Sequence, residues 1–88
     1  MRVRWLRRAL RALDDEASCI ALEDPAAARL VVERVIRAAA TLAEQPAIGR
    51  PGRVPGTREW VESPTRYVLP YRVKGSEAEI LAVFQTSR

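Results

Sequence analysis

The sequence predicts a single α+β domain spanning residues 1–88, in which an N-terminal strand precedes an antiparallel two-helix hairpin and three further strands. Helical apolar stripes fill the first half, and strand-like alternation fills the second. A stretch at residues 49–60 that holds three of the four glycines separates the two patterns. Short connections favour an antiparallel meander. With the first strand, this gives one twisted four-stranded sheet with the helices on one face and the other face open.

The first strand is short, because Val3 and Trp5 alternate with Arg2 and Arg4. From about residue 6 to residue 22 the apolar period becomes helical. The stripe consists of Leu6, Leu10, Leu13, Ala17 and Ile20. The single cysteine, Cys19, excludes an internal disulfide, and we expect it to be a small packed hydrophobic side chain.

The second helix begins at a clear signal, in which Asp24 can cap free amides and Pro25 suits the first helical position. We expect a connection of about two residues before it and an end near Gln45, because Pro46 follows. Its alanines permit close approach to the first helix. The predicted inner stripe comprises Ala28, Val31 or Val32, Val35, Ala39 and Leu42, widened by Ile36 and Ala43.

Three strands are predicted after the Gly/Pro stretch, at residues 58–62, 67–73 and 79–85. The last is the most apolar, which favours a central position in the sheet. Pro70 lies within the second of them and cannot donate a backbone hydrogen bond. We therefore expect Pro70 at an edge or a bulge.

The charge is unevenly distributed along the chain. Residues 1–48 carry eight Arg and seven acidic residues, a net of +1, whereas residues 49–88 carry six Arg, one Lys and four Glu, a net of +3. The second half is therefore the part that would attract an acidic partner. With no His and one Cys, we expect no zinc site, no Cys/His nucleophile pair and no cofactor. No apolar run approaches the ~20 residues of a membrane span and no signal peptide is evident, so we expect a cytoplasmic protein.

Six segments, in order, resemble the RelE/ParE toxins of bacterial toxin–antitoxin pairs. Residues 5–17 resemble the family's first helix, residues 24–28 its D/N-P-x-A-A helix opening, and residues 42–50 its L-x-x-x-P-x-x-G-R helix exit. Residues 55–59 resemble its G-T-R-E strand entry, residues 71–73 its Y-R-V strand, and residues 80–84 its last strand. The resemblance covers nearly the whole chain and implies the family's α+β fold.

The resemblance leaves two activities open. RelE-type relatives enter the ribosome and cut messenger RNA, whereas ParE-type relatives bind DNA gyrase and trap it on cleaved DNA. Gln85 stands where many relatives have His, and the sequence stops at Arg88, where relatives often continue for a few residues.

RNA cleavage requires groups that move protons, and the candidates here are Glu59, Glu62, Tyr67, Tyr71 and the arginines, which are poor proton donors. We therefore expect a ParE-like gyrase inhibitor with no catalytic residue. The alternatives are a ribosome-dependent endonuclease and a non-toxic antitoxin-binding relative. The resemblance also implies a ParD-like antitoxin and a toxin–antitoxin hetero-oligomer.

The resemblance and the charge distribution together predict two groups of contact residues. The candidates for contact with gyrase or nucleic acid are Arg50, Arg53, Arg58, Arg72, Gln85 and Arg88. The candidates for contact with the antitoxin or another interface are Trp60, Tyr71 and Glu59.

Several candidates have a structural alternative. One alternative for the Gly/Pro stretch is a solvated connection, with Arg50 and Arg53 as loop charges. The alternative for Arg58 is an ion pair with a neighbouring glutamate, that for Trp60 is burial against the helices, and that for Tyr71 is a place in the core.

Overall fold

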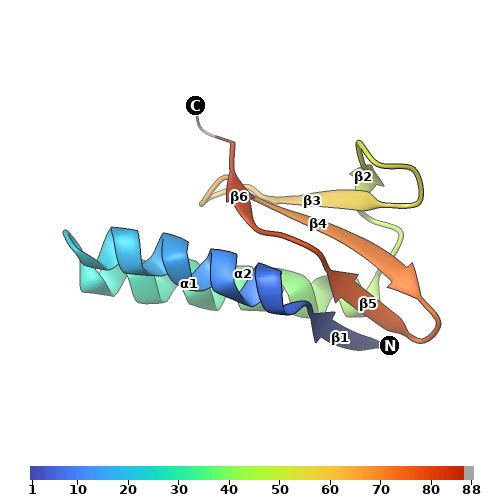
Figure 1. Ribbon diagram of the computed structural model, residues 1–88, viewed down its shortest axis with the longest axis horizontal. Helices are drawn as coiled ribbons and strands as arrows, with labels where there is room; N and C mark the ends of the chain where they lie inside the picture. Colours follow the sequence, from blue (N-terminus) through green and yellow to red (C-terminus); the bar gives the residue numbers. More distant parts are fainter. Residues whose placement is uncertain (87–88) are drawn as a thin grey trace.

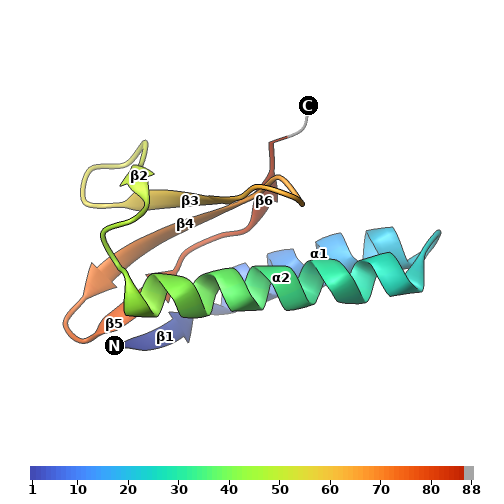
Figure 2. The ribbon, with the colours of Figure 1, turned by 180° about the vertical axis from the view of Figure 1, so that it is seen from behind.

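The computed structural model, which describes residues 1–86, has two layers: a helical hairpin and a twisted sheet (Figure 1). Strand β1 (Arg2–Trp5) leads into helices α1 (Arg7–Ala21) and α2 (Pro25–Glu44). Strands β2 (Arg50–Pro51), β3 (Arg58–Glu62), β4 (Tyr67–Lys74), β5 (Glu77–Ile80) and β6 (Phe84–Gln85) follow. The predicted α+β architecture, with both helices on one face of the sheet, is confirmed (Figure 2).

The sheet order is β1-β5-β4-β3-β2, and β6 pairs with β4 beyond the end of β5. Strand β1 runs parallel to β5, while the other pairs are antiparallel. The predicted meander therefore holds for β3, β4 and β5, and β5 has neighbours on both sides. The sheet of the described residues has six strands instead of four, because β2 and β6 add two short pairs of two residues each.

The predicted last strand, 79–85, is wrong as a continuous element. Tyr71 pairs with Ile80 and Val68 pairs with Phe84, so two residues of β4 lie opposite three residues of the other segment. This extra residue is a bulge, and it lies beside Pro70, whose carbonyl accepts a hydrogen bond from the Leu81 amide at 2.8 Å. The expectation that Pro70 sits at a bulge is confirmed.

The start of α2 is as predicted. The Asp24 carboxylate accepts a hydrogen bond from the Ala27 amide at 3.1 Å, and Pro25 occupies the first turn. The helix ends at Glu44, one residue before the expected boundary. Three residues, 22–24, connect the two helices instead of two.

The packing of the helices corrects part of the predicted stripes. Helix α1 buries Ala9 and Leu13, whereas Leu10 is 50% exposed. Helix α2 buries its predicted alanines, Val35 and Leu42, and also Ala38, while Ile36 is 50% exposed. Small side chains occupy the contact because the helices and sheet approach closely there. Cys19 is exposed, so its predicted packing is wrong.

Candidate functional site

The segment that leaves α2 is held to the sheet by two side chains from neighbouring strands. The Tyr71 hydroxyl donates to the Pro46 carbonyl at 2.6 Å and accepts from the Gly49 amide at 2.9 Å. On the same face of the sheet, Arg58 donates to the carbonyls of Gly49 at 2.8 Å and Ala47 at 3.3 Å. These four contacts fix where the Gly/Pro stretch begins.

The tip of that stretch is a compact turn at residues 52–57. The Gly52 amide donates to the Thr57 carbonyl at 2.8 Å, and the Thr57 hydroxyl donates to the Val54 carbonyl at 2.6 Å. Gly56 has a φ of 83°, a conformation that glycine adopts without steric cost. The turn therefore presents Arg53 and Val54 to solvent from a backbone held by its own hydrogen bonds.

The face of the sheet opposite the helices carries an apolar cavity of about 250 Å³ with cationic side chains around it. Phe84, Pro70 and Leu81 form part of its apolar lining, and Arg8 and Arg53 also border it. Beside the cavity, Arg50 forms a 3.2 Å ion pair with the buried carboxylate of Glu59. We call this surface the open face.

A second ion-pair group lies on the open face nearer the N-terminus. Glu79, which is almost completely buried, accepts a hydrogen bond from Arg72 Nε at 2.7 Å and lies 3.6 Å from Arg4. The hydrogen bond from Arg72 lowers the pKa of Glu79 below its ordinary value, and this outweighs the opposing effect of desolvation. The charges of Arg72, Lys74 and Arg4 lower it further.

This pKa shift predicts an acid-dependent loss of stability. The folded protein holds Glu79 at a lowered pKa. As the pH falls, the unfolded chain therefore binds more protons than the folded protein does at the same pH. The stabilisation is complete above the unfolded pKa of about 4.3 and is lost as the pH falls through the folded value. We expect urea midpoints measured between about pH 6 and about pH 3 to fall more steeply for the native chain than for Glu79→Gln. Equal falls of the urea midpoint with pH in the two proteins would contradict this contribution of Glu79.

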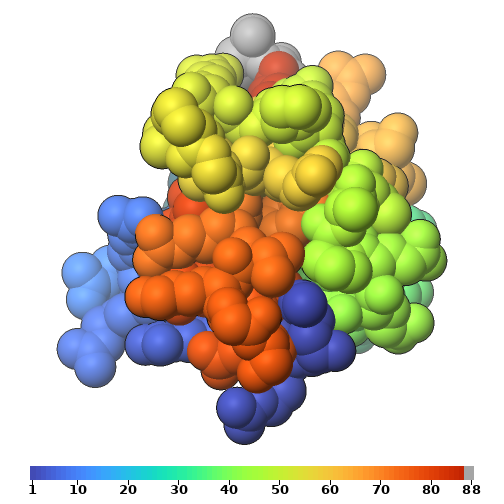
Figure 3. All heavy atoms as spheres, turned by 90° about the vertical axis from the view of Figure 1, so that its right-hand side faces the viewer, coloured from blue at the N-terminus to red at the C-terminus, as the bar shows by residue number. Residues whose placement is uncertain are grey.

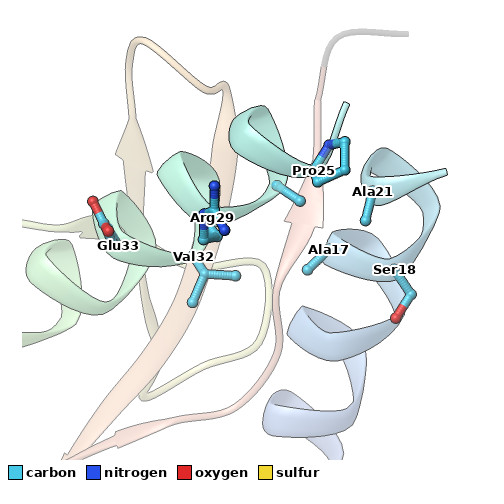
Figure 4. Close-up of a pocket in the computed structure, with 8 residues that line it drawn as sticks. Ala17, Ser18, Ala21, Pro25, Arg29, Val32 and Glu33 are labelled. Carbon is cyan, nitrogen blue, oxygen red and sulfur yellow. The ribbon is translucent and has the colours of Figure 1, made fainter. Parts of the chain in front are cut away.

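The helical hairpin carries a separate apolar groove of about 550 Å³ between α1 and α2 (Figure 4). Its floor consists of small or apolar side chains, among them Ala17, Ala21, Ala28 and Val32. Arg29 and Glu33 also line it and supply one charge of each sign. We call this surface the hairpin groove.

Comparisons with known proteins place this architecture in one family. Residues 3–88 match the model of the ParE toxin of type II toxin–antitoxin systems, parDE. The chain belongs to the ParE toxin family. It is 49% identical over 82 residues to "Putative toxin Y4kP" of Sinorhizobium fredii (strain NBRC 101917 / NGR234), covering 93% of this chain and 84% of that protein.

The fold of this ParE-family chain also matches a solved structure. That structure, described as "Chromosomal ParDE TA system from P. aeruginosa", superposes with a TM-score of 0.89 at 28% identity. The match covers 99% of this chain and 97% of the other. The protein is therefore a type II toxin of a ParDE-like system, which implies an antitoxin partner. No helix among residues 1–86 is long and apolar enough to cross a membrane.

The predicted site residues of this ParE-family toxin lie on different faces. Arg50, Arg53 and Arg72 have exposed side chains on or beside the open face. Glu59 is buried beneath Arg50, so it positions that arginine more than it offers a contact surface. Gln85 donates to the Thr65 carbonyl at 3.3 Å at the β3–β4 turn. Arg88 lies outside the described residues.

The other three candidates belong to the helix side of the sheet. Tyr71 is 0% exposed, so its predicted place at an interface is corrected: the ring is core and its hydroxyl is bonded to the backbone. Arg58 forms no ion pair among residues 1–86 and instead bonds to the carbonyls after α2. Trp60 packs against the core cluster and remains partly exposed.

Sequence reasoning missed Arg4, Arg8 and Phe84 as parts of the open face. The alternation in residues 2–5 predicts a strand, but the pairing of β1 with β5 is a tertiary contact that the pattern does not predict. The position of Arg8 depends on its 3.0 Å hydrogen bond to the Leu81 carbonyl, far away in the sequence. The sequence predicts Phe84 within a continuous strand, whereas the bulge places it in β6 opposite Val68.

Proposed function

We propose that this ParE-family toxin inhibits DNA gyrase by binding it, without cutting any bond itself. The observation that carries the proposal is that the two tyrosines and two glutamates considered for proton transfer are engaged in structural contacts, which leaves only arginines, and these are poor proton donors. Tyr71 is bonded to Pro46 and Gly49, and Tyr67 donates to Glu16 at 2.8 Å. Glu59 is paired with Arg50, and Glu62 accepts from Thr65. Glu59 alone of these four borders the cavity of the open face, and its carboxylate there is paired with Arg50.

Arginines of the open face and its turn are the proposed gyrase-binding surface. Arg53 and Val54 protrude together from a hydrogen-bonded turn, giving a charge beside an exposed apolar side chain. A preformed turn loses little conformational entropy on binding. Gyrase acts on DNA in the cytoplasm, and we propose the same location for the toxin.

The antitoxin is proposed to bind the hairpin groove. The groove is apolar and is floored by alanines, which leave room for the apolar face of an amphipathic helix. A flexible chain that folds on binding could cover this surface. We expect the antitoxin to be encoded beside the toxin and to neutralise it as a hetero-oligomer.

The gyrase proposal is tested with purified toxin, gyrase, ATP and supercoiled plasmid. We expect linear DNA to accumulate after denaturation of the enzyme. Arg53→Ala should require roughly three- to tenfold more toxin for the same cleavage, since removing a rim charge slows association. Arg34→Ala, which removes the same charge from α2, is the control. Cleavage of messenger RNA on translating ribosomes, with gyrase unaffected, would instead establish the endonuclease alternative.

A further inference from the structure

Three adjacent strands form a regular charged pattern on the open face. The register aligns Arg4 of β1 and Arg72 of β4 on either side of Glu79 of β5. Two residues further along, it aligns Arg2 and Lys74 on either side of Glu77. Two columns of cations therefore flank one column of carboxylates. Figure 3 looks at this end of the molecule, with the β4–β5 hairpin in orange beside the N-terminal segment in blue.

The cations of this pattern are presented to solvent while the central carboxylate is covered. The side chains of Arg4 and Arg72 are 59% and 45% exposed, whereas that of Glu79 is 3% exposed. Arg2 and Lys74 are exposed as well, and the Arg2–Glu77 separation is 3.9 Å. A partner that approaches this surface therefore meets four cationic side chains and the 30% exposed side chain of Glu77, while Glu79 lies beneath them.

The contact with Glu79 also leaves much of Arg72 available. A guanidinium carries five N–H donors, and Glu79 accepts from the Nε of Arg72 at 2.7 Å. Within residues 1–86, the two Nη groups of Arg72 make no hydrogen bond. An arginine with its Nε held and its Nη groups free is oriented to bind two oxygens of one anionic group.

We propose that these four cations bind the phosphate backbone of DNA, and that Glu79 is a positioning residue that holds Arg72 and Arg4 in place. Each column holds two cations, which lie two residues apart on one face of a strand, a separation of roughly 6.7 Å. Four exposed cations on one sheet, with an arginine that can bind two oxygens of one phosphate, suit a backbone of repeated phosphates. The proposal deepens the proposed function and rests on it, because gyrase holds the DNA that the toxin would contact.

The test measures binding of the whole toxin to a short fluorescent DNA duplex by anisotropy, over a series of salt concentrations and without gyrase. We expect Arg72→Gln to weaken binding about tenfold at low salt and to reduce the slope of log K against log salt by about one. Arg29→Gln, which removes the same charge in the hairpin groove, is the matched control and should change the slope little. Equal effects of the two variants on DNA affinity and on the salt slope would overturn the proposed phosphate site.

Glu79→Gln separates positioning from general electrostatics, because it adds one unit of net positive charge. If Glu79 orients the arginines, Glu79→Gln binds DNA several-fold more weakly than the native toxin. If the carboxylate only repels DNA, Glu79→Gln binds DNA more tightly, and the positioning role is overturned. Thermal unfolding checks that the variant is folded. Arg72→Lys, which keeps the charge but has no Nε for Glu79, should also weaken binding, and unchanged affinity would count against the proposal.

The two proposals fail separately. DNA binding by the toxin alone is measured without gyrase, so its absence would overturn the phosphate site while the cleavage assay with gyrase could still succeed. If the toxin binds an acidic protein segment but not DNA at this surface, the phosphate proposal is likewise overturned. If DNA binds as expected but gyrase is unaffected, the gyrase proposal fails and the phosphate site stands.

Discussion

Gly49→Ala should destabilise the protein by about 2–4 kcal/mol, which corresponds to a fall in Tm of roughly 10–25 °C for a domain of this size. A methyl group at residue 49 would lie 2.5 Å from the Tyr71 hydroxyl oxygen and 2.6 Å from Cε1 of the same ring. That ring is fully buried, so it has little room to move away. The overlap would also disturb the hydrogen bonds that the hydroxyl makes to Pro46 and Gly49.

Two comparisons identify the cause of that loss. Gly75→Ala places a methyl group in open space at a φ of 60°, so it should cost only about 1 kcal/mol of backbone strain. Tyr71→Phe should cost about 1–3 kcal/mol through the lost hydrogen bonds. Because it removes the atom nearest to the new methyl group, the double variant should be less destabilised than the sum of the two single variants. Additive effects, or a Gly49→Ala variant as stable as the native chain, would show that the close approach is not a constraint.

The elements that sequence patterns predicted well are those specified locally. The Asp24-Pro25 pair specified the start of α2 by the chemistry of one turn, and β3 has the predicted bounds 58–62. Pro70 predicted an edge or a bulge, because proline has no backbone N–H and must lie where no donor is needed, and the structure has the bulge. Each of these inferences depends on neighbours within a few residues.

The features that the sequence did not predict depend on contacts between distant segments. Arg58 resembled a functional arginine in its motif, but its partners are backbone carbonyls that no residue type reveals. Ala9 is buried in place of Leu10 because close packing of the helices on the sheet favours a small side chain over a larger neighbour. The row of Arg4, Glu79 and Arg72 exists only because β1 pairs in parallel with β5.

Ile36→Glu should abolish neutralisation by the antitoxin while leaving the toxin folded. Ile36 lies one helical turn beyond Val32, on the side of α2 that lines the hairpin groove, and is 50% exposed. Because it is exposed, a glutamate there is hydrated in the free toxin. In the complex, a bound helix would cover it, and the lost apolar contact plus the cost of desolvating a charge should weaken antitoxin binding at least ~30-fold.

Leu30→Glu is the matched control, since Leu30 is also 50% exposed on α2 but lies about 120° around the helix axis from Ile36. Affinity is measured by titrating each purified toxin variant with the product of the neighbouring reading frame, and neutralisation by growth on co-expression. Ile36→Glu should remain toxic in the presence of the antitoxin, whereas Leu30→Glu should be neutralised like the native toxin. If both variants bind the antitoxin with native affinity, the antitoxin lies elsewhere, and the hairpin groove has no part in neutralisation.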